Sequence, residues 1–194
     1  MRSGKDNEMR FVLSILKSPE SKYNANNLAK HIGISAMGAL KIARKLEKEG
    51  VIKLRKVGNA NIYSINFDSE YVLQYIKYLL KKESEQASAY VKRWIRELDK
   101  IKKAEAMILF GSVLRKEREA RDVDVLIIVH KNNFDAIKED ISKINIMNDK
   151  KVHPMYQTKK DLQKHINEEN KVVLNALKGI VVSGEDIVLS VLKQ

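Results

Sequence analysis

Two short apolar runs, residues 106–110 (AMILF) and 123–129 (VDVLIIV), most constrain the fold of this 194-residue chain. Both runs have the length and the aliphatic, β-branched composition of strands. Gly111 and Ser112 end the first run, and Asp122 and Asp124 open the second. The charged segment between the runs reads RKEREAR. The stretch therefore predicts either a charged turn between two strands or a site at the ends of those strands.

The rest of the second half alternates between helical and strand-like patterns, which predicts an α+β class with a small mixed sheet. We expect a short helix near 113–119, a helix over 134–147, a strand over 152–157, a mostly helical segment over 158–179, and a short final strand and turn over 180–187.

The first half carries three helical patterns followed by a hairpin pattern. The first helix has apolar residues at Met9, Val12, Leu13 and Leu16. The second spans about 24–31, with Leu28 and Ile32 inward and Gly33 as its end, and the third spans 36–49, with Ser35 as its cap and Gly50 as its stop. The third helix has an expected inward stripe of Met37, Leu40, Ala43 and Leu46. Two β-rich runs then flank Gly58 and Asn59, which is a hairpin signal.

This order of elements, with "GIS" before the third helix and "LEKEGVI" after it, resembles winged helix-turn-helix domains of prokaryotic regulators. The resemblance covers roughly residues 7–67 and implies that the third helix enters a DNA major groove. The side chains that would then contact DNA are Ser35, Lys41, Arg44, Lys45, Arg55 and Lys56. Ser35 also fits a helix cap, and the lysines also fit a solvated surface, while such domains also mediate protein contacts.

The net charge of +12 lies almost entirely in the first half. Residues 1–103 hold 22 Lys and Arg against 11 Asp and Glu, whereas residues 104–194 hold 15 against 14. A basic part joined to a nearly neutral part favours nucleic-acid binding by the basic part.

Residues 70–103 contain no Gly or Pro and predict a helical connection, with a kink, break or turn at KKESEQAS. Tyr71, Tyr75, Tyr78 and Leu79 share one expected face, and Val91, Trp94, Ile95, Leu98 and Ile101 share another. This connection either forms a homodimer or packs within one chain, and Trp94 fits packing better than base stacking. We expect three parts: a winged helix over 1–68, a connecting segment over 69–103 and a third domain over 104–194.

Asp122 and Asp124 are two residues apart, so in a strand they face the same side and can share Mg²⁺. Gly111 lets backbone approach a ligand closely, and the Ser112 hydroxyl and the start of the next helix suit a phosphate. The ordered set of strand, Gly-Ser, nine residues, Asp-x-Asp and strand resembles the nucleotidyltransferase superfamily of DNA polymerase beta, and its small prokaryotic members in particular. The resemblance covers about 104–185, including GIVVSGEDI, and implies that NTP phosphates bind at Gly111, Ser112 and Arg115, while Asp122 and Asp124 serve as catalytic and metal-binding residues.

Active members of that superfamily usually carry a third carboxylate on the next core strand, and this strand here reads KKVHPMYQ. His153 stands where the acidic residue is expected, and Asp149 lies upstream in the expected turn. His153 can act as a base or ligand, but a structural histidine before Pro154 is the favoured interpretation.

Two functions follow from these patterns. In the first, a DNA-binding protein carries a domain that binds NTP and Mg²⁺ and transfers a nucleotide to a hydroxyl acceptor. In the second, a non-catalytic transcriptional regulator or antitoxin-like protein uses a degenerate domain of this kind to sense nucleotide or to mediate assembly.

The chain has no cysteine, which excludes disulfides and thiolate chemistry. It also has no apolar run long enough to cross a bilayer. We therefore expect a cytoplasmic protein.

Overall fold

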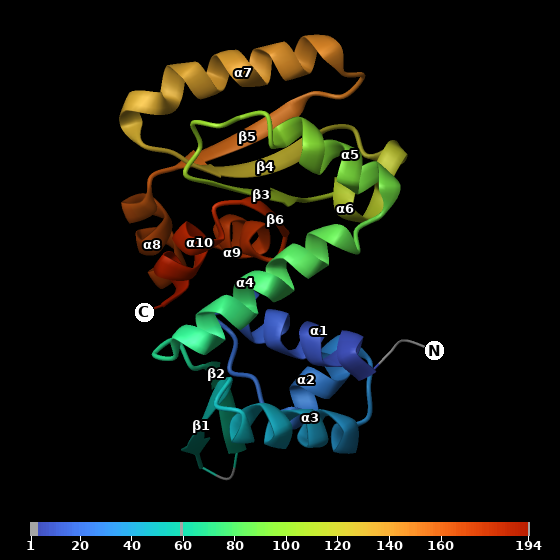
Figure 1. The fold of residues 1–194 in the computed structure, drawn as a ribbon, viewed down its shortest axis with the longest axis vertical. Coiled ribbons are helices and arrows are strands. Elements are labelled where there is room, and N and C mark those ends of the chain that lie inside the picture. Colours follow the sequence, from blue (N-terminus) through green and yellow to red (C-terminus); the bar gives the residue numbers. More distant parts are fainter. Residues whose placement is uncertain (1–3, 59, 194) are drawn as a thin grey trace. The chain divides into compact units, whose positions relative to one another are not determined.

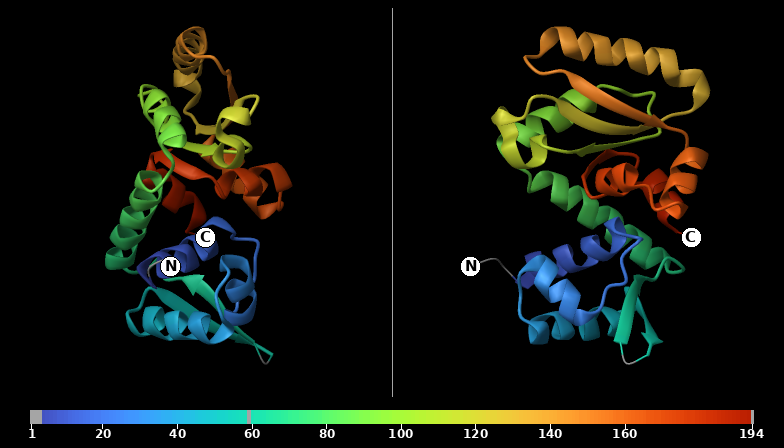
Figure 2. Two further views of the ribbon diagram at one scale, coloured as in Figure 1. Left: turned by 90° about the vertical axis from the view of Figure 1, so that its right-hand side faces the viewer. Right: turned by 180° about the vertical axis from the view of Figure 1, so that it is seen from behind.

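The computed structural model describes residues 4–58 and 60–193, in which helices and two small sheets form two compact units. The units comprise residues 1–79 and 80–194, and each is described by itself. Figures 1 and 2 show the elements along the chain. The mixture of helices with a small mixed sheet confirms the α+β class.

The N-terminal unit contains three helices, a two-stranded antiparallel hairpin and the first part of a fourth helix (Figure 1). The elements are α1 (Gly4–Lys17), α2 (Ala25–Ile32), α3 (Ala36–Lys48), β1 (Ile52–Val57), β2 (Ala60–Ile65) and α4 (Glu70–Glu85). The first five appear in the order expected of a winged helix. Of the two residues expected in the turn, Gly58 has a φ of 57°, and Asn59 lies outside the described residues.

Local capping explains where the second and third helices begin and end. The Asn24 side chain accepts hydrogen bonds from the backbone of Asn26 and Asn27, and Gly33 ends α2 with a left-handed φ of 71°. The Ser35 hydroxyl accepts a 3.0 Å hydrogen bond from the Gly38 backbone N–H and caps α3. These contacts confirm the predicted ends of both helices within one residue.

The inward face of α3 differs from the expected stripe. The buried residues are Ala39, Ala43 and Leu46, whose spacing of four and three residues places them on one face. Met37 is 73% exposed, so its inclusion in the stripe was wrong. Leu40 lies at the margin of the buried face, half-buried.

The connecting segment is two helices with a break. Helix α4 ends at Glu85 and α5 spans Ala89–Leu98, so the polar KKESEQAS stretch contains the break. On α4 the buried residues are Val72, Ile76, Leu79 and Leu80. Of the expected tyrosine face, Tyr71 and Tyr78 are 60% and 59% exposed. Tyr75 is half-buried, and its hydroxyl donates a 3.0 Å hydrogen bond to Glu8 Oε1.

The C-terminal unit is a four-stranded mixed sheet with helices on both faces (Figures 1 and 2). Its strands are β3 (Ala106–Phe110), β4 (Val123–Ile128), β5 (Val152–Gln157) and β6 (Ile180–Ser183), in the order β5-β4-β3-β6. Only the β4–β5 pair of this sheet is parallel. Its helices after α5 are α6 (Val113–Lys116), α7 (Phe134–Met147), α8 (Lys159–Asn167), α9 (Lys171–Leu177) and α10 (Glu185–Leu192), with one-turn 3₁₀ helices at 117–119 and 131–133.

The predicted bounds of β3, α7 and β5 are confirmed to the residue, whereas α10 replaces part of the expected final turn.

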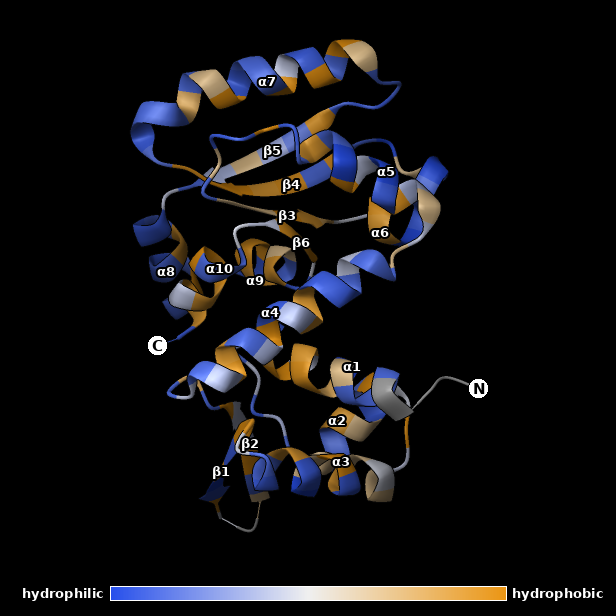
Figure 3. Cartoon of the chain, in the orientation of Figure 1, coloured by the Kyte–Doolittle hydropathy of each residue, from blue (hydrophilic) through white to orange (hydrophobic). Residues whose placement is uncertain are grey.

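The central strands are buried on both faces, and Figure 3 colours them mostly hydrophobic. Odd-numbered residues of β3 and β4, such as Met107 and Val125, form one core with α5 and α7. Even-numbered residues face the other side, where α9 and α10 contact β3. Trp94 of α5 is fully buried in the first core, which confirms the packing interpretation.

Candidate metal site

Asp122 and Asp124 lie at the start of the central strand β4, on the side of the sheet opposite α5 and α7. Asp124 is paired in register with Phe110 on β3 and with His153 on β5. Because β5 runs parallel to β4, both strands begin at this edge of the sheet. The sheet therefore brings the Asp-x-Asp pair, the end of β3 and the start of β5 together.

His153 lies beside this aspartate pair and points to solvent. Its side chain is 76% exposed, and Nδ1 lies 3.4 Å from Oδ1 of Asp124, whose side chain is 24% exposed. One ligand atom from each of Asp122, Asp124 and His153 lies within 4.8 Å of the other two. An exposed side chain contributes little to packing, so the expectation of a structural histidine is not supported by its surroundings. The position of His153 opposite Asp124 agrees with the expected place of the third carboxylate.

Gly111 touches the same carboxylate from the β3 side. Its φ is 81°, and a Cβ at this position would lie 2.1 Å from Oδ2 of Asp124. Two separate reasons therefore require glycine here: the left-handed backbone and the space that Asp124 occupies. We expected Gly111 to allow close approach of a ligand, and the structure shows that the Asp124 carboxylate itself makes the close approach.

Ser112 and Arg115 lie directly after Gly111, in a segment that is less helical than expected. Helix α6 is a single turn, and Glu117, the first residue of the 3₁₀ turn, has a φ of 49°. The Ser112 carbonyl accepts from the backbone N–H groups of Arg115 and Lys116, while its hydroxyl caps nothing. The Arg115 side chain is exposed. So short a helix supplies little dipole for a phosphate, and any anion contact here depends on the side chains and on local N–H groups.

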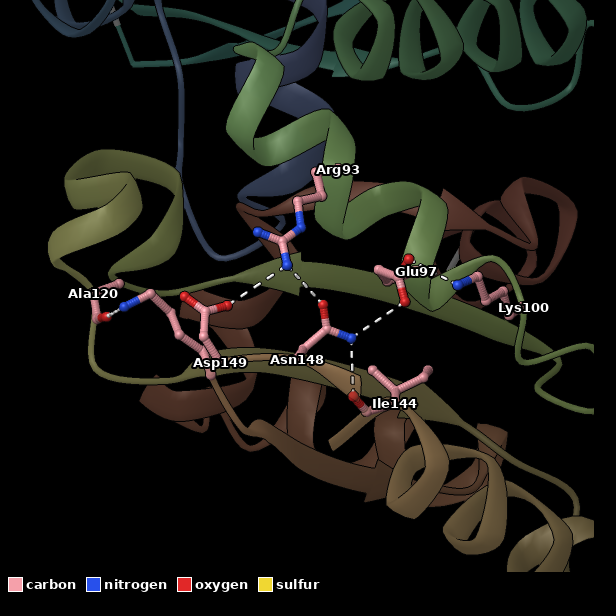
Figure 4. A network of polar contacts seen from close by, with 8 residues as sticks. Arg93, Glu97, Lys100, Ala120, Ile144, Asn148 and Asp149 are labelled. Carbon is pink, nitrogen blue, oxygen red and sulfur yellow. Dashed lines mark hydrogen bonds and ion pairs between the residues drawn. The ribbon is translucent and has the colours of Figure 1, made fainter. Parts of the chain in front are cut away.

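The other acidic candidate, Asp149, lies in the turn before β5 and belongs to a different group of contacts. Arg93 of α5 bonds to Asn148 at 2.9 Å and pairs with Asp149 at 3.6 Å, as Figure 4 shows. Asn148 also donates to the Ile144 carbonyl and to Glu97. Asp149 therefore does not join Asp122 and Asp124, in agreement with its expected place in a turn.

The same turn is tied to the segment that carries Asp122. Lys150 Nζ donates a 2.5 Å hydrogen bond to the Ala120 carbonyl, drawn in Figure 4 as the dashed line that ends at the labelled Ala120. The Val123 N–H donates to the Lys151 carbonyl. These bonds accompany the register of β5 against β4 in which His153 lies opposite Asp124. We did not anticipate these contacts from the sequence, because a lysine in a polar turn carries no signal of its partner.

Two carboxylates and one imidazole are donors that fit a divalent cation. Such ions bind oxygen and imidazole nitrogen at about 2.0–2.2 Å. The ligand atoms of Asp122, Asp124 and His153 lie within 4.8 Å of one another, on the scale of the distance between two ligands of one ion. The donor set fits, although it contains a nitrogen where Mg²⁺ prefers oxygen.

The expected DNA-binding residues lie in the N-terminal unit, on α3 and on β1. Lys41, Arg44, Arg55 and Lys56 are all exposed. Lys45 is also exposed, but its ammonium bonds to Glu8 Oε2 at 2.5 Å and lies 3.9 Å from Glu49. The hydrogen bond from Lys45 to Glu8 raises the pKa of the lysine above its usual value. The Lys45 ammonium is therefore already bonded to carboxylates of the N-terminal unit. The Ser35 hydroxyl is likewise used as the cap of α3.

Within the described chain, no helix combines the length and the apolar character needed to span a membrane.

Residues 92–178 match the family model described as Polymerase beta, Nucleotidyltransferase. This range includes Gly111, Ser112, Asp122, Asp124 and His153, and it assigns a nucleotidyltransferase-like domain to this part of the chain. Among solved structures, the chain is similar to the crystal structure of Sso10a-2, a DNA-binding protein from Sulfolobus solfataricus, with 24% identity and a TM-score of 0.32. That similarity covers 46% of this chain and 93% of the other. The comparison with curated proteins gave no match.

Proposed function

We propose that the C-terminal unit binds a nucleoside triphosphate together with a divalent cation and transfers its nucleotidyl group to a hydroxyl acceptor. One observation carries this proposal: Asp122, Asp124 and His153 converge at the sheet edge where β3 ends in Gly111 and Ser112. The family match over residues 92–178 supports it.

Each residue has a task in binding the nucleotide. Asp122 and Asp124 hold the cation, which would neutralise phosphate charge and favour departure of pyrophosphate. Gly111 leaves the space that the Asp124 carboxylate occupies. The Ser112 hydroxyl donates to a phosphate oxygen, and the exposed Arg115 guanidinium pairs with the phosphate chain.

In the transfer itself, the acceptor oxygen forms a bond to the α-phosphorus, and the bond from that phosphorus to the bridging oxygen of pyrophosphate breaks. The hydroxyl proton passes to solvent, since among the described residues the cluster contains two carboxylates and no third to take it. General-base assistance typically contributes about 10²- to 10⁴-fold to a rate. We therefore expect transfer to be slow.

The test is incorporation of label from each α-³²P-labelled NTP into cell extract, with divalent cation present. Wild type should label an acceptor, and Asp122→Asn/Asp124→Asn should not. Asp135→Asn/Asp140→Asn is the matched control, because it removes two carboxylates of α7 outside the cluster. Equal labelling by wild type and the Asp122/Asp124 variant would refute transfer by this site.

A second candidate is a regulator that senses nucleotide without turnover, or an antitoxin-like protein that uses the domain for assembly. The observation in its favour is the imidazole at the position of the third carboxylate. Calorimetry separates the two candidates. Metal-dependent NTP binding that Asp122→Asn/Asp124→Asn abolishes, without any labelled product, supports the sensor.

For the N-terminal unit we propose DNA binding through Lys41 and Arg44 on α3 and Arg55 and Lys56 on β1. The support is their exposure and the surplus of basic residues in the first half of the chain. We assign these side chains to contact with phosphate, because phosphate contacts need charge but no base-specific geometry.

We also propose that the protein forms a homodimer through residues 69–103. Light scattering of the purified protein tests this.

A further inference from the structure

The third member of the metal-binding cluster is a nitrogen donor. His153 is the parallel-strand partner of Asp124, and its Nδ1 lies 3.4 Å from Oδ1 of that aspartate. The side chain is 76% exposed, so burial does not constrain the imidazole, and it can turn toward an ion beside Asp124. Pro154 restricts the backbone of His153 to extended conformations, which keeps its Cα in strand register.

The metal-binding cluster lies at an exposed edge of the sheet. At such an open site, the chemical type of the donor atoms decides which divalent ion is preferred more strongly than the size of the site does. Mg²⁺ is a hard ion that prefers oxygen and keeps much of its water, whereas imidazole suits first-row transition ions. The affinity of a mixed nitrogen and oxygen site rises from Mn²⁺ through Co²⁺ and Ni²⁺ to Cu²⁺, and falls again at Zn²⁺. An aspartate in place of His153 would give an all-oxygen site, which suits Mg²⁺. The histidine adds a nitrogen donor, which shifts the preference of the site toward first-row transition ions.

We infer that His153 is a metal ligand that makes this site selective for first-row transition ions over Mg²⁺. This inference rests on the proposed function, because it specifies the cation that accompanies the nucleotide. It names a different cation from the Mg²⁺ expected from the resemblance and assigns His153 the role of ligand instead of proton acceptor.

The test compares metal affinities without any measurement of turnover. Titration followed by electron paramagnetic resonance gives the Kd for Mn²⁺, competition gives the Kd for Mg²⁺, and Co²⁺ binding is followed by its visible absorption. The protein is the full chain, as wild type, His153→Asp and His153→Ala. His130→Ala is the matched control, because His130 is an exposed histidine beyond the far end of β4, about 20 Å away at 3.3 Å per residue.

In wild type we expect tighter binding of Co²⁺ and Mn²⁺ than of Mg²⁺. His153→Ala should weaken Co²⁺ binding by at least about tenfold, since even the loss of an outer-shell partner costs on the order of 10- to 100-fold in affinity. His153→Asp should weaken Co²⁺ binding and strengthen Mg²⁺ binding, and His130→Ala should change neither.

The outcomes separate this inference from the proposed function. Suppose that wild type binds metal and Asp122→Asn/Asp124→Asn does not, but both His153 variants keep the wild-type preference for Co²⁺ over Mg²⁺. This result would refute the ligand role of His153 and leave the proposed metal site at Asp122 and Asp124 intact. If wild type binds no divalent ion, or the aspartate variant binds as well as wild type, both proposals are wrong.

Discussion

Asp124 Oδ1 lies 3.4 Å from His153 Nδ1, across the parallel pair of strands β4 and β5. The other oxygen of this carboxylate occupies the space where a Cβ of Gly111 would lie. Asp124 thus lies between Gly111, the first residue after β3, and His153, the second residue of β5. The predictions below test whether this arrangement binds a cation and what keeps it in place.

Gly111→Ala should abolish metal binding. The new Cβ would lie 2.1 Å from Oδ2 of Asp124, so the carboxylate has to move. The left-handed φ of 81° adds strain of about 1–3 kcal/mol, which a thermal melt would register. Gly58→Ala is the control: its φ is 57°, but nothing lies within 4 Å of its Cβ, so metal affinity should be unchanged. Equal metal affinity in Gly111→Ala and wild type would show that Asp124 does not hold the ion.

Lys150→Ala should weaken metal binding by roughly tenfold, the lower range for loss of a supporting contact. The Lys150 ammonium bonds to the Ala120 carbonyl at 2.5 Å and secures the segment that leads into Asp122 (Figure 4). The neighbouring Lys151 provides the control, because its ammonium bonds to the Asn145 carbonyl on α7 instead. Calorimetric titration with Mn²⁺ measures both variants. The supporting role fails if Lys151→Ala weakens metal binding as much as Lys150→Ala does.

Lys41→Ala and Arg55→Ala should each weaken DNA binding uniformly across sequences. Each should lower the slope of log affinity against log salt by about one, as expected for loss of one phosphate contact. Lys45→Ala should have a smaller effect, because its ammonium is already bonded to Glu8. Fluorescence anisotropy with labelled duplexes at several salt concentrations measures the slopes. A slope near zero in wild type would exclude phosphate contact altogether.

Glu97→Gln should reduce the loss of stability at acid pH. The hydrogen bond from Lys100 and a further one from Asn148 lower the pKa of Glu97 below its usual value. A depressed folded pKa contributes stability that is present above the unfolded pKa of about 4.3 and is lost as pH falls through the folded pKa. Urea unfolding at pH 7 and pH 3.5, followed by fluorescence of the single tryptophan, Trp94, measures the difference. Glu105→Gln, at an exposed carboxylate without a hydrogen bond or ion pair in the described chain, is the matched control.

Local patterns predicted most of the fold because caps, glycines and strand composition act over a few residues. Asn24 and Ser35 marked two helix starts, and the strands expected over 106–110 and 152–157 have the observed bounds of β3 and β5. The failure concerns which face of a helix is buried. Met37 is apolar but 73% exposed, because the packing partner of a helix decides its inner face and periodicity alone admits neighbouring stripes.

The candidate site was predictable in part. Asp122 and Asp124 could be placed together by the two-residue period of a strand. The contact between Asp124 and His153 depends on the order β5-β4-β3-β6 and on the register of a parallel pair 29 residues apart in sequence. The contact between Lys150 and Ala120 is equally non-local. Such relationships come from tertiary structure, and no local signal in the chain encodes them.

The central claim is that Asp122, Asp124 and His153 together bind a divalent cation with a nucleotide. Diffraction from crystals of the full chain soaked with MnCl₂ and a non-hydrolysable NTP, recorded at a wavelength where manganese scatters anomalously, tests it most directly. The account predicts an anomalous peak in contact with both aspartates and with His153, and nucleotide phosphates beside Gly111 and Ser112. An ordered nucleotide elsewhere, or no anomalous peak at this sheet edge under saturating metal, would contradict it.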